Sequence, residues 1–107
     1  MKVAAVQHDV VWEDAPATYR HLAPMIANAA AAGARLVVLT EMFSTGFSMA
    51  TDRIAEPFDG PSAQFLVEQA CAHDVWVCGS VPERSSEGIA EERPGNVLVL
   101  AAPDGTT

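Results

Sequence analysis

Residues 33–41 read GARLVVLTE, and this stretch decides the fold. Gly33 is a residue type that ends helices, and the run Leu36–Leu39 that follows is apolar without interruption. A short continuous run of this kind is typical of a strand that is buried on both faces of a parallel sheet. Thr40 and Glu41 come directly afterwards, so they mark the carboxyl end of the predicted strand.

Three further runs share these features, namely β-branched apolar residues bounded by polar or turn residues. They are Val3–Val6, Val75–Val81 and Val97–Leu100. Each predicts another strand of the same sheet. The polar stretch 83–96 predicts a solvated loop between the last two of these strands.

Two helical patterns lie between the strands. Asp14 can cap a first helix, whose apolar positions recur at spacings of three and four as far as Gly33. Pro24 falls inside this pattern, so we expect either a kink there or a helix that starts later. A second helix is predicted from Pro61 to His73, because proline is tolerated in the first helical turn. This alternation of strands and helices predicts an α/β fold with helices packed on a sheet.

The composition excludes several classes of partner. The chain has 107 residues, which fits one domain at most, and 6 basic against 14 acidic residues give a formal charge of −8. Because nucleic acids and anionic membranes attract clustered cations, we expect neither as a partner. No apolar stretch has the length of a membrane span or the form of a signal peptide. We therefore expect a cytoplasmic protein, and the 2 cysteines are too few for a secreted disulfide scaffold.

The carboxyl-terminal residues predict a turn without its returning strand. Val97–Leu100 runs into Pro103, Asp104 and Gly105, and an Asp-Gly pair after an apolar strand is typical of a hairpin. An unpaired strand edge is a feature that natural domains avoid. We therefore expect this chain to be the amino-terminal part of a larger domain, truncated after its fourth strand.

Glu41 is the residue with the best position for chemistry. Ligands of open α/β sheets bind in the crevice at the carboxyl ends of the strands, and Glu41 follows such an end. We expect its carboxylate to point into that crevice rather than into bulk water. Position alone leaves open the alternative of a solvated carboxylate with no functional role.

Residues 39–49, LTEMFSTGFSM, resemble the first catalytic motif of the nitrilase superfamily, the carbon-nitrogen hydrolases, and look closest to its ω-amidase branch. Other segments resemble the family in the same order along the chain. They correspond to the family's first strand (3–7), second strand with the preceding helix exit (33–39), third strand (79–81), and fourth strand and turn (96–100 and 103–105). Nearly the whole chain is covered.

The resemblance implies an α-β-β-α sandwich, of which residues 1–107 are the amino-terminal part of a single carbon-nitrogen hydrolase domain. Members hydrolyse amides or nitriles with a Glu, Lys and Cys set. By this resemblance Glu41 is the general base that takes the proton of the cysteine thiol, and Phe43 is a candidate substrate contact. The family's Lys, Cys and second Glu match no residue present, so we expect the chain alone to be inactive.

The branch resemblance also implies a substrate class. It is a small ω-amide such as 2-oxoglutaramate, which keeps a free carboxylate and therefore needs a cationic partner. Arg53 is a weak candidate for that partner. No cofactor is implied, and the complete protein is expected to be a homodimer or larger. Another amidase or a nitrilase of the same superfamily remains an alternative.

Residues of the right type also occur at positions that match nothing in the family. Lys2 begins the first predicted strand, and we interpret it as a solvated residue. Cys71 and Cys78 read as small buried hydrophobes rather than nucleophiles. The histidines have no mutual spacing suited to a metal, so no metal site is predicted: His8, His21 and His73.

Two other functions remain open from the sequence. Residues 46–50, GFSMA, are one residue short of the G-x-S-x-G motif that would make Ser48 a nucleophile, but that motif requires a tight strand-to-helix turn. A non-catalytic, small acidic α/β binding module would explain the absence of a nucleophile. It would not explain the unpaired last strand.

Overall fold

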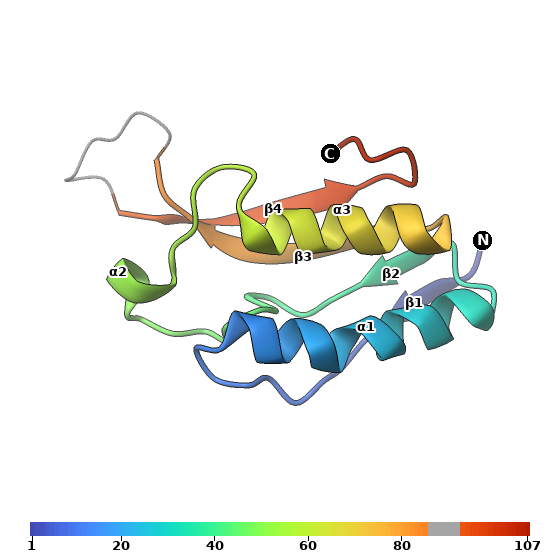
Figure 1. Cartoon of the computed structure of the whole chain (residues 1–107), viewed down its shortest axis with the longest axis horizontal. Helices are drawn as coiled ribbons and strands as arrows, with labels where there is room; N and C mark the ends of the chain where they lie inside the picture. Colours follow the sequence, from blue (N-terminus) through green and yellow to red (C-terminus); the bar gives the residue numbers. More distant parts are fainter. Residues whose placement is uncertain (86–92) are drawn as a thin grey trace.

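The computed structural model describes residues 1–85 and 93–107, and it contains a four-stranded sheet (Figure 1). The strands follow one another in the order β1 (Val3–Ala5), β2 (Leu36–Val38), β3 (Trp76–Glu83) and β4 (Gly95–Ala101). β1, β2 and β3 are parallel, and β4 is antiparallel to β3. The predicted α/β class is confirmed. The predicted loop between β3 and β4 lies partly outside the described residues, at 86–92.

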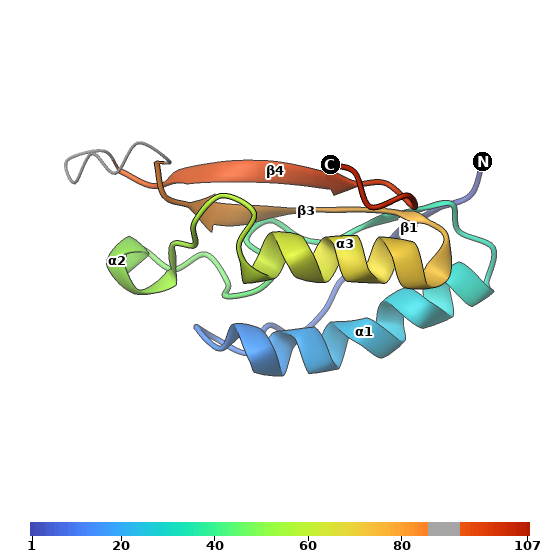
Figure 2. The same cartoon turned by 45° about the horizontal axis from the view of Figure 1, so that its top comes forward.

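The two long helices, α1 (Ala15–Ala31) and α3 (Pro61–His73), lie on one face of the sheet (Figure 2). The core forms between them and the sheet, from completely buried side chains. These are Leu22 and Ile26 of α1, Leu66 of α3, Val37 of β2 and Val77 of β3. A short helix, α2 (Thr51–Ile54), was not predicted from the sequence.

The helix predictions are largely confirmed. Asp14 caps α1, since its Oδ1 accepts a hydrogen bond of 3.1 Å from the backbone nitrogen of Ala17. α1 continues through Pro24, so the alternative of a later start is wrong. It ends just before Gly33, whose φ of 96° requires a residue without a side chain. α3 has the predicted bounds.

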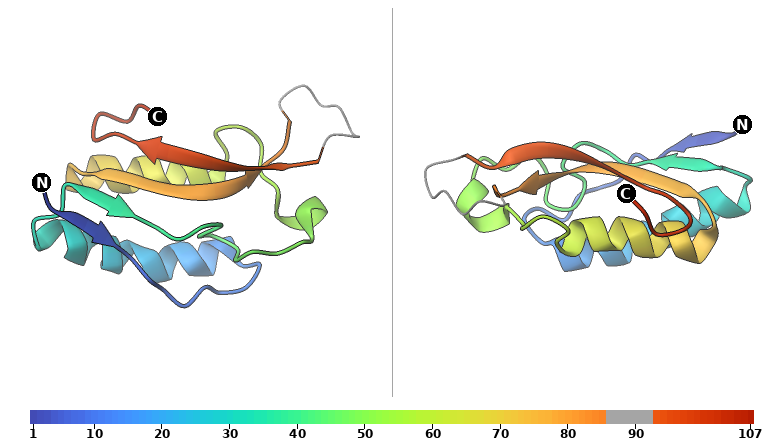
Figure 3. Two further views of the ribbon diagram at one scale, coloured as in Figure 1. Left: turned by 180° about the vertical axis from the view of Figure 1, so that it is seen from behind. Right: turned by 90° about the horizontal axis from the view of Figure 1, so that it is seen from above.

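The two faces of the sheet differ, and this corrects the expectation that the strands are buried on both faces. Alternate residues such as Val77 and Val81 are buried under the helices. Apolar side chains on the other face are exposed: Val3 (50%), Trp76 (44%), Leu98 (69%) and Leu100 (43%). The reason is that both long helices cover the same face, so residues 1–85 and 93–107 provide no layer for the other one. Figure 3 (left) views the sheet from this uncovered face.

The turn after β4 forms as predicted. The backbone nitrogen of Ala102 donates to the carbonyl of Thr106 at 2.8 Å, and Asp104 Oδ1 accepts from the nitrogen of Thr106 at 2.9 Å. β4 pairs with β3 along one edge, and no other strand of the described segments pairs with its second edge. The helices of these segments are too short or too polar to cross a bilayer.

Candidate functional site

Glu41 lies immediately beyond the carboxyl end of β2, as predicted, and lines a hollow of about 350 Å³. The uncovered face of the sheet contributes Cys78, Ser80 and Leu98 to this hollow. The side-chain amide of Asn96 donates a hydrogen bond to Glu41 Oε1, with a nitrogen–oxygen distance of 2.6 Å. Glu41 itself is exposed. Its expected shielding from water is therefore absent here, because nothing described covers this face of the sheet.

The backbone after Glu41 is held by β3. Met42 adopts a φ of 52°, which is uncommon for a residue other than glycine. Its backbone nitrogen donates to the hydroxyl of Ser80 at 2.8 Å, and its carbonyl accepts from the nitrogen of Gly46 at 2.9 Å. The tight turn after Glu41 is thus tied to the neighbouring strand.

Phe43 fixes the same turn from the other face of the sheet. Its ring is completely buried, next to Phe65 at a centroid distance of 6.1 Å. A Cβ on Gly79 would lie only 2.6 Å from Phe43 Cδ1, so the ring occupies the space that the glycine leaves. Because Phe43 packs in the core and does not line the hollow of Glu41, this packing gives no support to its expected contact with substrate.

A buried polar cluster holds the next residue of the turn. The hydroxyl oxygens of Ser62, at the start of α3, and Ser44 lie 2.8 Å apart, within hydrogen-bond distance. The Tyr19 hydroxyl lies 2.7 Å from the same Ser62 oxygen. Glu56 accepts from both the backbone nitrogen and the hydroxyl of Ser62, so it caps α3 in place of a side chain at Gly60. Burial raises the pKa of Tyr19 to about 12.

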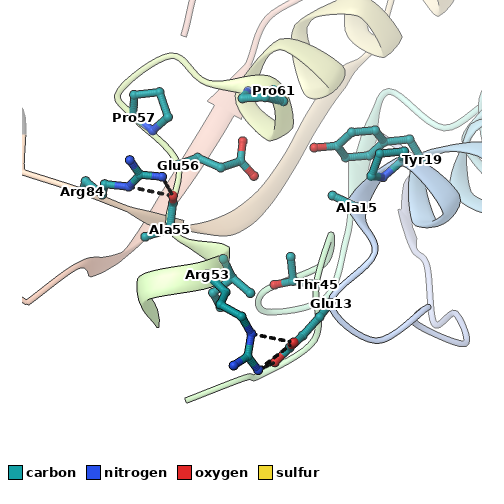
Figure 4. A pocket seen from close by; sticks show the side chains of 12 residues that line it. Glu13, Ala15, Tyr19, Thr45, Arg53, Ala55, Glu56, Pro57, Pro61 and Arg84 are labelled. Atoms are coloured by element: carbon teal, nitrogen blue, oxygen red, sulfur yellow. Dashed lines mark hydrogen bonds and ion pairs between the residues drawn. The ribbon is translucent and has the colours of Figure 1, made fainter. Parts of the chain in front are cut away.

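Figure 4 shows a second hollow, of about 400 Å³, which has no residue in common with that of Glu41. The charged groups that line it already have partners. Arg53 Nη2 lies 2.9 Å from Glu13 Oε2, and Arg84 donates to the carbonyl of Ala55. The weak candidate for a substrate carboxylate, Arg53, therefore lines a different hollow from Glu41 and is already paired.

Ser48 does not have the setting of a nucleophile. It is buried, and its hydroxyl donates to Glu13 Oε1 at 2.6 Å. β2 ends at Val38 and α2 begins at Thr51, so the strand-to-helix turn that the serine-hydrolase alternative needs is absent at Ser48. The hydrogen bond from Ser48, followed by those from Arg53, lowers the pKa of Glu13.

The remaining residues discounted from the sequence are scattered. Lys2 donates to the carbonyl of Ala32 at the end of α1 at 2.7 Å. Cys71 is free and exposed, so the expectation that it is buried is wrong. Cys78 is also free and lines the hollow of Glu41, where burial raises the pKa of its thiol. Among residues 1–85 and 93–107, no group of three or more His, Cys, Asp and Glu side chains is arranged to hold a metal.

Sequence reasoning missed Ser80 and Asn96 as partners of the Glu41 turn. A signal exists for Asn96, because it precedes Leu98 and Leu100 at alternate positions of one strand. A polar amide at the start of an apolar row is a departure from the pattern. The partner of the Asn96 side chain depends on which strands pair, and the sequence alone does not reveal that pairing.

The family profile described as "Carbon-nitrogen hydrolase" matches residues 2–107. The chain belongs to the carbon-nitrogen hydrolase family. It is 30% identical over 106 residues to the omega-amidase YafV of Yersinia enterocolitica, a match that covers 99% of this chain and 38% of that protein.

Solved structures agree with this assignment. A CN-hydrolase superfamily protein from Xanthomonas campestris, with an arsenic adduct in its active site, superposes with a TM-score of 0.84 at 31% identity, over 97% of this chain and 37% of that one. An amidase from Nesterenkonia sp. superposes with a TM-score of 0.75 at 21% identity, over 98% of this chain and 39% of that one, which supports the fold. The predicted nitrilase-like fold is confirmed. This carbon-nitrogen hydrolase chain spans less than two fifths of the length of these relatives.

Proposed function

We propose that the protein containing this chain hydrolyses the carbon–nitrogen bond of small ω-amides, with Glu41 as its general base. The observation that carries the proposal is the Glu41 carboxylate at the carboxyl end of β2, held by Asn96 at 2.6 Å in a hollow of the uncovered face. Family membership and the omega-amidase relative support the same reaction class.

The geometry of Glu41 suits proton acceptance. Asn96 occupies Oε1, and no other described residue donates a hydrogen bond to the carboxylate, so Oε2 keeps lone pairs that no residue of 1–85 or 93–107 engages. In the proposed reaction this oxygen takes the proton of a cysteine thiol, and the resulting thiolate attacks the amide carbon. Ammonia leaves, and water then hydrolyses the thioester. By the family resemblance, the cysteine and the lysine that stabilises the oxyanion come from outside this chain.

The ω-amide substrate rests on the branch resemblance and on the omega-amidase relative. An ω-amide of a dicarboxylic acid carries a free carboxylate, which binds best to a cationic group. Arg53 is paired with Glu13 and lines another hollow, so it does not support this role. We therefore place the cationic partner outside the described residues. Phe43 as a substrate contact stays a prediction.

A substrate panel tests the proposal on the protein that contains this chain. We expect ammonia release from 2-oxoglutaramate with a larger kcat/KM than from aliphatic nitriles or N-carbamoyl amines. Faster turnover of a nitrile or a carbamoyl amine would overturn the ω-amide assignment and favour another amidase or a nitrilase of the superfamily. No turnover of any of them would favour the non-catalytic binding module. Four further expectations remain predictions: a homodimer or larger assembly, a cytoplasmic location, the lack of a cofactor, and the lack of nucleic-acid or membrane partners.

A further inference from the structure

We propose that Asn96 is a positioning residue for Glu41, which orients the carboxylate so that one of its oxygens can accept a proton. This inference rests on the proposed function. Its basis is the hydrogen bond from Asn96 Nδ2 to Glu41 Oε1, which is short at 2.6 Å and joins residues 55 positions apart. An ionised carboxylate can only accept hydrogen bonds, so the amide must present its NH₂ group to Glu41.

The topology explains why a residue of β4 reaches the end of β2. β4 is antiparallel to β3, so its beginning, and not its end, lies beside the carboxyl ends of β2 and β3. Asn96 pairs with Pro82 in this register, close to the end of β3. β3 lies between β2 and β4, and its residue Ser80 lines the hollow. The small side chain of Ser80 leaves room for the amide of Asn96 to reach Glu41.

The residue type also fits a positioning role. Asn96 belongs to an alternating row whose next two members, Leu98 and Leu100, are exposed apolar residues on the uncovered face. Asparagine is depleted in strands, and here the amide finds its partner in Glu41 alone among the described residues. An amide donor is neutral, so it orients a carboxylate without supplying the opposite charge that would weaken it as a base.

Two contacts therefore fix the position of Glu41. Ser80 holds the backbone through the nitrogen of Met42, and Asn96 holds the side chain. Without Asn96, the exposed Glu41 side chain would sample other rotamers while its backbone stayed in place. A base displaced by about 1 Å loses roughly 10² in rate, which sets the size of the expected effect.

The kinetic test uses the protein that contains this chain, with 2-oxoglutaramate as substrate. We expect Asn96→Ala to lower kcat by about 10- to 100-fold while KM stays within about twofold. Asn96→Asp should lower kcat at least as much, since it places a second carboxylate beside Glu41 at the same shape. Asn28→Ala is the matched control, because Asn28 is an exposed residue of α1, and it should leave both constants unchanged. A kcat for Asn96→Ala within twofold of the parent protein would overturn the proposal.

A second measurement does not depend on turnover. The side-chain NH₂ signals of Asn96 are followed by NMR in protein labelled with ¹⁵N-asparagine and are assigned by their absence in Asn96→Ala. Glu41→Ala should shift them and leave those of Asn28 unmoved. Unmoved Asn96 signals would overturn the contact itself. If they move but no amide is hydrolysed by the parent protein, the contact stands and the proposed function fails.

Discussion

At the scale of single residues, the negative charge of Glu13 is stabilised by hydrogen bonds from its neighbours. The hydroxyl of Ser48 and the guanidinium of Arg53 donate to it, which lowers its pKa in the folded protein. Deprotonation therefore favours folding: this stability is present above the ordinary carboxyl pKa, about 4.3, and is lost as the pH falls below it. We expect Glu13→Gln to reduce the loss of stability between about pH 5 and pH 3.

Urea unfolding at a series of pH values checks this prediction. The parent protein should lose stability more steeply with acidity than Glu13→Gln does. The difference should shrink in high salt, because the Arg53 side chain is largely exposed, at 64%. Parallel curves for the two proteins would contradict the assigned role of Glu13.

Tyr19 gives a second residue-scale prediction. Burial raises its pKa to about 12, so in the folded protein the phenol keeps its proton. The stability linked to this group is present below the ordinary tyrosine pKa, about 10, and is lost as the pH rises from there towards 12. The absorbance difference at 295 nm between the parent protein and Tyr19→Phe should rise near pH 12. A midpoint near 10 in the folded protein would show that Tyr19 is not in the buried cluster.

The sequence located Glu41 but not its partners, for a physical reason. Motif and strand-end position are local features, and both indicated Glu41. Its contacts with Ser80 and Asn96 depend on which strands pair and in what register, and those are properties of the assembled sheet. The same reason explains Phe43: which side of the sheet it faces is decided by the turn at Met42, where φ is positive.

At the scale of elements, β3 is shaped to receive the Glu41 turn, and Gly79 is the decisive position. A Cβ there would lie 2.6 Å from Phe43 Cδ1 and 3.3 Å from Leu39 Cβ. We expect Gly79→Ala to destabilise the protein by about 1–3 kcal/mol, because both neighbours are packed in the core. It should also lower amidase activity by displacing the turn.

Gly95→Ala is the control for this prediction. A Cβ at Gly95 would meet Val97 Cγ2 at an ordinary contact distance of 3.6 Å. Its unfolding midpoint in urea should stay close to that of the parent protein. Equal midpoints for Gly79→Ala and the parent would show that the packing of Phe43 on β3 is not what holds the turn.

The elements themselves were well predicted where local signals are strong. Asp14 and Pro61 mark helix starts by capping and by tolerance of proline, and both helices begin as expected. The strand faces were wrong because continuous apolar runs do not reveal which layers a chain supplies. α2 was missed since it has four residues and no side-chain cap at Ala50.

At the scale of the whole molecule, the uncovered sheet face leads us to predict that the 107-residue chain self-associates when it is isolated. Trp76, Leu98 and Leu100 are exposed there, and one edge of β4 has no partner strand among the described segments. Such a surface promotes association. We expect the isolated chain to elute as concentration-dependent oligomers in light-scattering chromatography and Leu98→Glu to reduce them. A monodisperse monomer over a broad concentration range would contradict this expectation.

The isolated chain should also be inactive. Glu41 alone cannot form an acyl intermediate without a nucleophile and an oxyanion partner. Ammonia release from 2-oxoglutaramate by the purified chain should therefore equal that of its Glu41→Gln variant. Release well above that variant would mean that a residue of this chain, such as Cys78, is a nucleophile after all.

The central claim is that Glu41 is a catalytic base, and its most direct test is the acylation rate of Glu41→Gln in the protein that contains this chain. Glutamine keeps the shape and an acceptor for Asn96 but removes the basicity, so the variant should fold normally and lose about 10²- to 10⁴-fold in acylation. Glu68→Gln, at an exposed position of α3, should acylate like the parent protein. A folded Glu41→Gln protein that kept most of its acylation rate would contradict the account.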